Sequence, residues 1–458
     1  MSSRWLWILL LITAPLYAQP DALARRARRY FTDLVRIDTT NPPGNETPAA
    51  GYIRGVLAVE GIPAELLGGD KRRLNVVARL GGSGAARPLL LMAHTDVVPA
   101  DRSQWTVDPF AGKIESGFLY GRGALDDKCL LAAEMAVLVE LKRRGVKLAR
   151  DVILLGEADE EAGSTGIQWL IANAWSKIDA EFAINEGGYA MDTSAGVRLF
   201  QVQTSEKVPT RVVLTAQGTA GHGSLPRADN PVVRLARAIT RLAEADQPVS
   251  LTTTTRRYLR EISRLPDYQW LGQLLPKLED ASSAPAAARA ALSKDSEIAA
   301  ILHTTVSPTM LEAGVKINVI PNTAGAQVDV RRLPNETREE VMARFRRIIN
   351  DTSVKVEAAG GQDMPSTEPS SLTTPLYLAM EKALSKAHPK SLVVPYMTRG
   401  ATDGAYLRHK GMAVYGAPVF LRTDKESRAH GNDERLGLAS FDAGVGLLWE
   451  IVTAVAVQ

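Results

Sequence analysis

Histidine and acidic residues stand directly after short apolar runs at three places in the chain. The residues are His94, Asp96, Glu160, Glu161 and Glu186, which follow the runs 89–93, 152–156 and 182–185. Asp126 and Asp127 open a further stretch, 128–144, whose apolar residues recur at helical spacing. Imidazole and carboxylate groups are ligands that zinc accepts without any cysteine. The spacing therefore indicates chemistry carried out at a metal site.

Each of these residues taken alone has an ordinary structural explanation. A single histidine after a strand usually packs, paired aspartates commonly cap a helix, and two glutamates fit a solvated loop. Taken together, those explanations gather several like charges in one cleft with nothing to neutralise them, which is costly away from water. A pair of divalent cations removes that cost. With two ions about 3.5–4 Å apart, one carboxylate bridges them, a shared water loses its proton, and another carboxylate acts as general base.

The elements that must position these groups alternate between apolar runs and helical stretches from residue 73 onward. That alternation predicts an α/β fold with a mostly parallel sheet. We expect buried strands at 74–80, 89–93, 152–156 and 182–185, and a helix at 128–144. Ligands of an open α/β sheet bind in the crevice beyond the carboxyl ends of its strands. The histidine and acidic side chains should therefore share one pocket.

The pattern changes near residue 208, where polar and apolar residues alternate. This alternation predicts half-exposed strands at 210–216 and 324–331. Helices are expected at 231–246, 256–275 (broken at Pro266), 284–301 and 337–350. The first pattern returns near Leu376. We therefore expect an inserted α+β lid domain over 208–356, between two parts of a catalytic domain, 19–207 and 357–458.

The N-terminus, 1–18, has one arginine, an apolar run and then small residues. This is the pattern of a secretory signal peptide cleaved after Ala18, and an uncleaved anchor is the alternative. We therefore expect an exported protein, periplasmic or secreted, without a membrane span after cleavage. Cys129 is the only cysteine, which excludes an internal disulfide.

Composition is that of a soluble globular protein large enough for two domains. The 458 residues are 45% hydrophobic and 23% charged, and the formal net charge is +3. The one basic cluster, at 25–29, fits the solvated face of a helix. A nucleic-acid partner is therefore disfavoured.

Several motifs, in one order, resemble the co-catalytic zinc family of aminoacylases. They are LMAHTDVVP (91–99), WTVDPF (105–110), GRGALDDK (121–128), DEEAGS (159–164), NEGG (185–188), GHGSLP (221–226), NVIPN (318–322), DVR (329–331), RGATDG (399–404) and AHGNDE (429–434). This is family twenty of the metallopeptidases, with carboxypeptidase G, carnosine dipeptidases, acetylornithine deacetylase and succinyl-diaminopimelate desuccinylase. The resemblance covers about residues 25–455. It implies a zinc-peptidase catalytic domain, of the phosphorylase/hydrolase-like type, with an inserted ferredoxin-like lid that commonly forms a homodimer.

The resemblance also implies roles for individual residues. The ligands of two Zn²⁺ ions, for which Co²⁺ or Mn²⁺ could substitute, would be His94, Asp126, Glu161, Glu186 and His430. Asp126 would bridge the ions and precede a cis peptide bond to Asp127. Glu160 would be the general base. Asp96 would hold the imidazole of His94 in the correct tautomer without binding the metal itself. Spacing alone does not separate Asp126 from Asp127, or Glu160 from Glu161.

Substrate-binding roles are implied for four further residues. His222 would polarise the scissile carbonyl, often across a dimer interface, while Asn318 and Arg331 would grip the substrate, Arg331 by its carboxylate. The backbone around Gly400 would bind the same anion. For Asn318 the alternative is that it only organises the turn before Pro321. One departure from the family is Cys129, where glycine is usual.

The motif at 185–188 and the insertion at about 245–305 resemble the carboxypeptidase S branch and its N-fatty-acyl amino acid hydrolase relatives. The function expected first is an exopeptidase that releases a C-terminal amino acid. An N-acyl amino acid amidohydrolase comes second, since both substrates present a carboxylate to Arg331. A zinc- or peptide-binding protein without catalysis is disfavoured by the presence of Glu160. An aminopeptidase lacks a clear acidic anchor for the substrate amine.

Overall fold

The structure is a computed structural model that describes residues 21–360, 364–422 and 428–457. The predicted signal peptide, 1–18, lies outside the described residues. A nine-stranded mixed sheet has the order β1-β2-β6-β3-β7-β17-β9-β16, with β8 paired to β9. Its strands are β1 (Ala64–Leu67), β2 (Asn75–Leu80), β3 (Leu89–His94), β6 (Val152–Glu157), β7 (Phe182–Asn185), β8 (Tyr189–Asp192), β9 (Arg198–Glu206), β16 (Ser391–Thr398) and β17 (Ala413–Gly416).

The expected α/β fold is confirmed, but the expectation of a mostly parallel sheet holds only for the centre and for the pair β9 and β16 at one edge. Strands β6, β3, β7 and β17 are parallel to their neighbours in that run. On one side β2 pairs antiparallel with β6 and β1, and on the other β9 pairs antiparallel with β17 and β8. A buried apolar run has the same composition in either direction, so the sequence did not reveal these reversals.

Both faces of the large sheet are covered by helices, which explains why its central strands are apolar throughout. In β3, Leu89 and Leu91 face one layer, and Leu90 and Met92 face the other. The first layer holds α1 (Ala22–Val35), α2 (Thr47–Val59), α3 (Lys128–Arg143), α12 (Pro375–Ala387) and α14 (Leu438–Ala456). The second holds α4 (Thr165–Asn173), α5 (Trp175–Ile178) and α13 (Gly404–His409).

Helix α14 is long and apolar enough to cross a membrane, judged by length and composition alone. It packs on α1, α3 and α12, and its Phe441, Val445 and Leu448 are fully buried there. These contacts are those of a core helix in a globular protein. A small sheet of β4 (Lys113–Glu115), β5 (Phe118–Tyr120) and β18 (Arg435–Gly437) lies next to its N-terminus.

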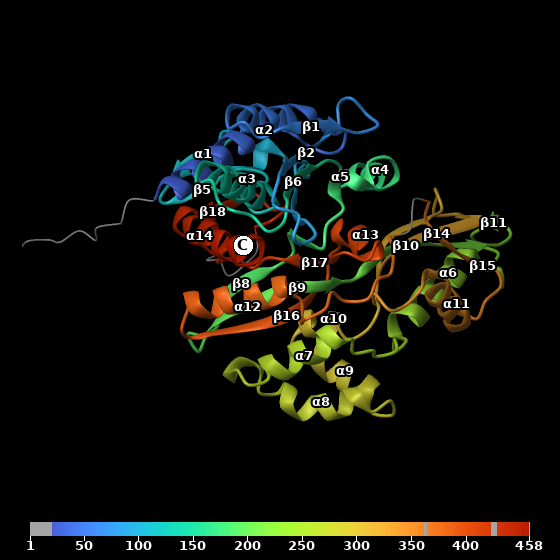
Figure 1. Ribbon diagram of the computed structural model, residues 1–458. Helices are drawn as coiled ribbons and strands as arrows, with labels where there is room; N and C mark the ends of the chain where they lie inside the picture. The colour runs from blue at the N-terminus through green and yellow to red at the C-terminus, as the bar shows by residue number, and fades with distance from the viewer. Residues whose placement is uncertain (1–20, 361–363, 423–427, 458) are drawn as a thin grey trace, which may run out of the picture.

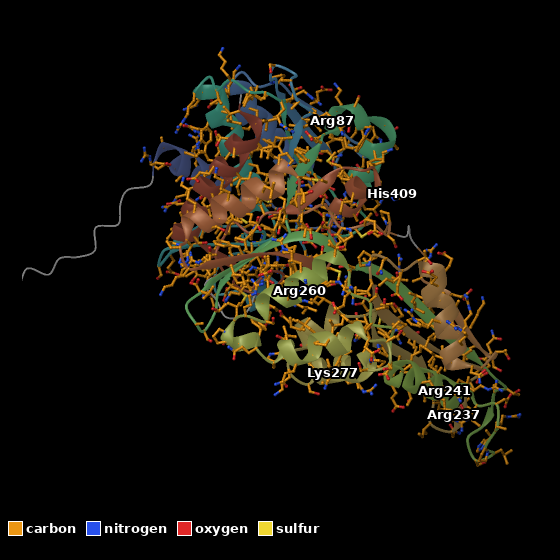
Figure 2. The ribbon with its side chains drawn as sticks, turned by 60° about the horizontal axis from the view of Figure 1, so that its bottom comes forward. Arg87, Arg237, Arg241, Arg260, Lys277 and His409 are labelled. Carbon is orange, nitrogen blue, oxygen red and sulfur yellow. The ribbon has the colours of Figure 1, made fainter. Side chains whose placement is uncertain are left out.

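A second sheet, here called the inserted sheet, is antiparallel with the order β12-β14-β10-β15. Its strands are β10 (Val208–Gln217), β12 (Thr305–Ala313), β14 (Thr323–Arg332) and β15 (Val354–Ala358), and α6 (Pro231–Glu244) and α11 (Arg338–Ile349) pack on it. Buried and less buried residues alternate along β10 and β14, because only one face is covered by helices. Figure 2 shows Arg237 and Arg241 of α6 at the end of the molecule away from Arg87.

The remaining helices of the expected insert pack elsewhere. They are α7 (Thr253–Ile262), α8 (Leu271–Glu279), α9 (Ala284–Leu292) and α10 (Ser296–Ala300), with a short 3-10 turn, Pro266–Tyr268, at the expected break. Their apolar residues join Leu199 of β9 and Val394 and Tyr396 of β16 in one buried cluster. Figure 1 shows them beneath β16, apart from α6 and α11. The segment between β10 and β15 thus contributes to two different cores.

Candidate active site

The ends of β3, β6 and β7 bring the predicted metal-site residues together. These three strands are neighbours in the parallel centre of the sheet, so their carboxyl ends meet at one edge. His94 is the last residue of β3, Glu160 and Glu161 follow β6, and Glu186 follows β7. Asp126 lies before α3, and the peptide bond between Asp126 and Asp127 is cis. Two groups of side chains that could hold a metal ion form here, His94 with Asp126 and Glu161, and His94 with Glu160 and Glu186.

Asp126 lies between the two histidines, and each of its oxygens faces one of them. Asp126 Oδ1 is 2.9 Å from His94 Nε2, and Oδ2 is 3.2 Å from His430 Nε2. Glu186 Oε1 lies 4.0 Å from His94 Nε2, and Glu161 Oε1 lies 3.0 Å from His430 Nε2. The arrangement is two imidazole–carboxylate pairs joined through one carboxylate. Two imidazoles and three carboxylates arranged in this way are the donor set of a carboxylate-bridged metal pair.

The orientation of His94 is fixed by the backbone that follows it. Its Nδ1 lies 2.9 Å from the carbonyl oxygen of Asp96, which can only accept, so Nδ1 carries the proton and donates it. Nε2 is then the nitrogen left for a metal ion. The carboxylate of Asp96 is farther away, with Oδ1 at 3.6 Å from Nδ1. Asp96 was predicted to hold the imidazole with its carboxylate, but its backbone carbonyl group makes the closer contact.

The carboxylate of Asp96 instead organises the turn that carries the two glutamates. It accepts hydrogen bonds from the backbone N–H groups of Glu160 and Glu161, each at 3.1 Å, and from Asn41 Nδ2 at 2.8 Å. Asn41 also donates to Asp159 at 2.9 Å. Both Asp96 and Asn41 are buried. Asn41 is a residue that the sequence analysis missed, since an asparagine between Thr40 and two prolines reads as a turn.

A buried ion pair fixes the backbone at Asp126. Glu434 accepts from the N–H groups of Leu125 at 2.6 Å and Asp126 at 3.2 Å, and its other oxygen binds Arg122 at 2.5 Å. Burial raises the pKa of Glu434 to about 7, against the lowering effect of Arg122. Arg122 belongs to the GRGALDDK motif and Glu434 to the AHGNDE motif, but the sequence predicted no role for either.

The electrostatics of the cluster show what bound cations would change there. Burial raises the pKa of Glu160 well above its usual range, and the neighbouring Glu186 carboxylate raises it further. Burial and the Asp126 carboxylate raise the pKa of Glu186 in the same way. Hydrogen bonds with Asp126 and Glu161 raise the pKa of His430 to about 10. Two divalent cations would reverse this balance, because they favour ionised carboxylates and neutral imidazoles. The residues present therefore fit a metal pair.

A second carboxyl pair, not assigned from the sequence, lies beside this cluster. Glu157 at the end of β6 and Asp403 at the start of α13 are both buried. Burial raises the pKa of Glu157, with a further contribution from Asp403, and burial raises the pKa of Asp403 to about 6. Asp403 belongs to the RGATDG motif, so the turn at 399–404 reaches the metal-site edge of the sheet.

The turn at 399–404, which contains Gly400, is tied to two other parts of the molecule. Glu206 accepts from the N–H and hydroxyl groups of Thr402, at 2.7 and 2.8 Å, and pairs with Arg408. Arg399 forms an ion pair with Glu297 of α10 at 2.7 Å. Gly400 itself is exposed, with open space around it. The predicted anion-binding turn is therefore held in place by its neighbours rather than by Gly400.

The predicted substrate residues of the inserted segment lie in two places. His222 of β11 (Gly221–His222) pairs with Val319 of β13 (Val319–Ile320), and the N–H of Gly223 donates to the carbonyl of Asn318 at 2.8 Å. We call residues 219–225 and 314–322 the arm. His222 and Asn318 are exposed on it. Arg331 lies apart from them, in β14, where it forms an ion pair with Asp329 at 3.0 Å.

Comparisons with known proteins agree with this arrangement. Residues 90–454 match peptidase family M20/M25/M40, and the chain belongs to this family. The predicted family resemblance is thereby confirmed. Human N-fatty-acyl-amino acid synthase/hydrolase PM20D1 is 28% identical over 388 residues, which cover 81% of this chain and 75% of that protein. Human aminoacylase-1 is 28% identical over 440 residues, which cover 93% of this chain and 94% of that protein.

The fold is also that of a solved family member. An M20 family metallo-carboxypeptidase, Sso-CP2 from Sulfolobus solfataricus, superposes with a TM-score of 0.72 at 22% identity. The superposition covers 94% of this chain and 99% of the other. The chain is thus a metallopeptidase or amidohydrolase homologue of the M20 family.

Proposed function

We propose that this protein uses two divalent metal ions, zinc in the first place, to hydrolyse the amide bond of a small peptide or an N-acylated amino acid. The observation that carries the proposal is Asp126, whose two oxygens each face a histidine at 2.9 and 3.2 Å. His94 and Glu186 would complete one ion's shell, and His430 and Glu161 the other's. Bound there, the ions would polarise a carbonyl group and lower the pKa of water.

Glu160 is the residue proposed to move the proton. Its backbone is fixed by Asp96, and its side chain groups with His94 and Glu186 without bridging the histidines. Glu160 would take a proton from the attacking water as the carbon–oxygen bond forms. It would return that proton to the amide nitrogen as the carbon–nitrogen bond breaks. The products are a carboxylic acid and a free amine, and no further reactant is needed.

The substrate is proposed to present a free carboxylate to Arg331 of the inserted sheet. A peptide that loses its C-terminal amino acid is the first choice, and an N-acyl amino acid is the second. Similarity to a metallo-carboxypeptidase supports the first, and similarity to an N-fatty-acyl-amino acid hydrolase and to aminoacylase-1 supports the second. The carboxylate would lie on the amine side of the scissile bond in both.

A matched substrate panel tests the function and chooses between the substrates. Dipeptides and N-acyl amino acids that share one C-terminal residue are compared by kcat/KM. The protein is then stripped with a chelator and reloaded with Zn²⁺, Co²⁺ or Mn²⁺. We expect hydrolysis to disappear on chelation and to return with the metal. A folded, metal-loaded protein that hydrolyses neither class would contradict the proposal and favour a binding protein without catalysis.

We also propose that the arm acts across a homodimer. Val315 and Ile317 beside Asn318 are fully exposed, and Leu225 beside His222 is 67% exposed. An apolar surface next to two substrate residues would be covered if a second copy bound there. Mixing two inactive variants, His222→Ala and Glu160→Gln, tests this. Subunit exchange should restore about a quarter of the wild-type activity if His222 serves the partner's metal site. No recovery in a mixture shown to exchange subunits would mean that each chain works alone.

Export is proposed from the apolar N-terminus, 1–18, and it has a simple test. Mass spectrometry of the protein recovered from outside the cytoplasm should show an N-terminus at Gln19. A chain that keeps Met1 in the membrane fraction would show an uncleaved anchor instead.

A further inference from the structure

One acidic side chain in the apolar core has no part in the proposed chemistry. Glu134 is in the middle of α3 and is fully buried, and its neighbours along the helix include the buried Leu131, Met135 and Leu138. Burial raises the pKa of Glu134 well above its usual range, which favours the uncharged acid. A carboxyl group in such a place is costly unless it has a hydrogen-bond partner. The partner of Glu134 therefore indicates why an acid stands there.

That partner is the backbone of β3. The N–H group of Met92 donates to Glu134 Oε1 at 3.1 Å. Met92 is 1% exposed and Glu134 is 0% exposed, so water does not compete for this bond. Within the part of the chain that the structure describes, Oε2 of Glu134 has no hydrogen-bond partner. Glu134 therefore contributes a single acceptor oxygen, and it gives that oxygen to a strand.

The N–H group of Met92 needs this acceptor because the sheet divides beside it. The pairing of β3 with β7 ends at Leu91, whereas its pairing with β6 continues to His94. The N–H groups of a strand alternate between its two neighbours, and that of Thr95 donates into β6. The N–H group of Met92 therefore points toward β7, where the pairing has already ended. Glu134 supplies the acceptor that β7 no longer provides.

This hydrogen bond joins the two elements that carry facing residues of the metal-site cluster. Met92 is two residues before His94, which ends β3, and Glu134 is on the helix that follows Asp126. Asp126 Oδ1 and His94 Nε2 lie 2.9 Å apart. The bond at Met92 thus fixes the end of β3 against α3. It thereby fixes the distance between the histidine and the carboxylate that faces it.

We propose that Glu134 is a positioning residue, which sets the spacing of His94 and Asp126 by holding the end of β3 against α3. The inference rests on the proposed function, because it concerns the geometry of the proposed metal pair. The role requires an acceptor oxygen that reaches Met92, and it does not require a charge. The ion assigned to His94 and Glu186 should therefore depend on Glu134 more than the other ion does.

The first experiment separates the acceptor oxygen from the charge. Glu134→Gln keeps an acceptor of the same reach without an acid, whereas Glu134→Met keeps the length and loses the acceptor. Competition with a chelator of known affinity measures both zinc ions of each protein. We expect Glu134→Gln to bind both ions as the wild type does. Glu134→Met should bind one of the two ions about 10–100-fold more weakly, the usual loss when a group that orients a metal ligand is removed.

A matched control lies in the same helix. Glu140, in the last turn of α3, accepts from Arg26 and Arg144, each at 2.5 Å, and its side chain is 8% exposed. Glu140→Met also removes a largely buried acceptor, so it should lower the denaturant concentration at which the protein unfolds. Its zinc affinity should equal that of the wild type. If Glu140→Met weakens one zinc ion as much as Glu134→Met does, the effect reflects general stability and the proposal is wrong.

The second experiment reports ligand geometry without turnover. Co²⁺ replaces zinc, and its visible absorption depends on the type and arrangement of its ligands. The spectrum of Glu134→Met should differ from that of the wild type, and the spectra of Glu134→Gln and Glu140→Met should match it. A wild-type spectrum in Glu134→Met would overturn the proposal, since the ligands would then be placed correctly without Glu134.

A further variant keeps the proposal testable if Glu134→Met does not fold. Glu134→Asp retains the acid but withdraws its oxygen atoms by one carbon, so the acceptor no longer reaches Met92. It should weaken the same zinc ion, whereas Glu134→Gln should not. Wild-type zinc binding by Glu134→Asp together with weakened binding by Glu134→Gln would show that the acid matters and the reach does not, and would overturn the proposal.

The outcomes separate this inference from the proposed function. Wild-type affinity for both zinc ions in every variant, together with amide hydrolysis, overturns only the role of Glu134. Zinc binding that depends on Glu134, in a protein that hydrolyses no amide, supports that role and overturns the proposed function. A folded wild-type protein that binds no zinc overturns both.

Discussion

The metal-site cluster and the arm differ in how firmly the rest of the molecule holds their side chains. His94 is 1% exposed and makes hydrogen bonds through both ring nitrogens. His222 is exposed, and its Nδ1 lies 2.7 Å from the hydroxyl oxygen of Ser224 in the same turn. A preorganised cluster suits bond-breaking chemistry, whereas an exposed arm suits a step in which a second surface arrives. The comparison shows that the molecule holds the side chains of the cluster in fixed positions and leaves those of the arm exposed.

The largest effect is expected within the cluster, at the proposed base. Glu160→Gln should lower kcat by about 10²–10⁴-fold, since it removes proton transfer but keeps the shape of the side chain. Bound zinc, measured by elemental analysis, should stay at two ions per chain. Glu244→Gln, which changes an exposed glutamate of α6, is the control and should behave as wild type. Loss of zinc together with activity would make Glu160 a ligand and remove the distinction between it and Glu161.

A somewhat smaller effect is expected in the arm. His222→Ala should lower kcat by about 10²–10³-fold, the cost of removing one group that stabilises a developing oxyanion. Zinc content should be unchanged, because the arm contributes no ligand to the proposed pair. Lys316→Ala, in the same exposed arm, serves as the control. If His222→Ala releases metal, the arm is part of the cluster and the two regions are not separate in function.

The hydrogen bonds behind the cluster should matter less than the ligands themselves. Asn41→Ala leaves Asp96 and Asp159 each without one donor, and should weaken zinc binding by about 10–100-fold. Competition with a chelator of known affinity measures this change. Thr40→Ala, next to it, removes a hydroxyl group that donates to Asp38 at 2.7 Å, and should have no such effect. Equal zinc affinity in both variants would mean that the hydrogen bonds of Asn41 do not position the metal ligands.

The smallest effect concerns the junction between the two sheets, where Lys207 lies between β9 and β10. Burial lowers the pKa of Lys207 from 10.5 to about 7. The unfolded lysine keeps its proton between pH 7 and 10, and the folded one loses it, so raising the pH in this window favours the folded state. From pH 7 to pH 9 the free energy of unfolding should rise by about 2 kcal/mol relative to Lys207→Met.

Denaturant titrations of wild type and variant at the two pH values measure this difference. Lys277→Met, which removes an exposed lysine of α8, is the control and should keep the wild-type slope (Figure 2). Parallel stability profiles for wild type and Lys207→Met would show that Lys207 keeps its charge when buried.

Much of the architecture was predictable because hydrophobic pattern and position along the chain carry it. The strands at 89–93, 152–156 and 182–185 were placed to within one residue, since fully buried strands are short uninterrupted apolar runs. Their order in space was not, and neither was strand direction at the edges of the sheet. The helices α7–α10 have apolar faces that fit either sheet, so the sequence did not reveal that they pack on β16.

The site shows the same division between local and non-local information. Spacing predicted that His94, Glu160, Glu161 and Glu186 lie at the ends of strands, which the structure confirms, and the family resemblance favoured Asp126, whose oxygens face the two histidines. The residues that fix them were not found, because their role exists only through contacts across the fold. Glu434 bonds the backbone of Leu125 and Asp126 from more than 300 positions away, and Asn41 reaches Asp96 and Asp159.

The packing of α7–α10 on β16 determines where the inserted sheet can pivot. Helix α6 packs on that sheet and α7 on the large one, so a rotation of the inserted sheet would bend the chain between Glu244 and Thr253, and again between Ala300 and Thr305. These two connections are joined to each other, because Val249 pairs with His303 and the N–H of Ser250 donates to Leu302 at 3.0 Å. Lys207 donates to the carbonyls of Ala300 and His303 at 2.7 and 2.8 Å, at the same spot. Three connections of the chain thus meet at one hydrogen-bonded point. A rotation of the inserted sheet about this point would leave α7–α10 in place on β16.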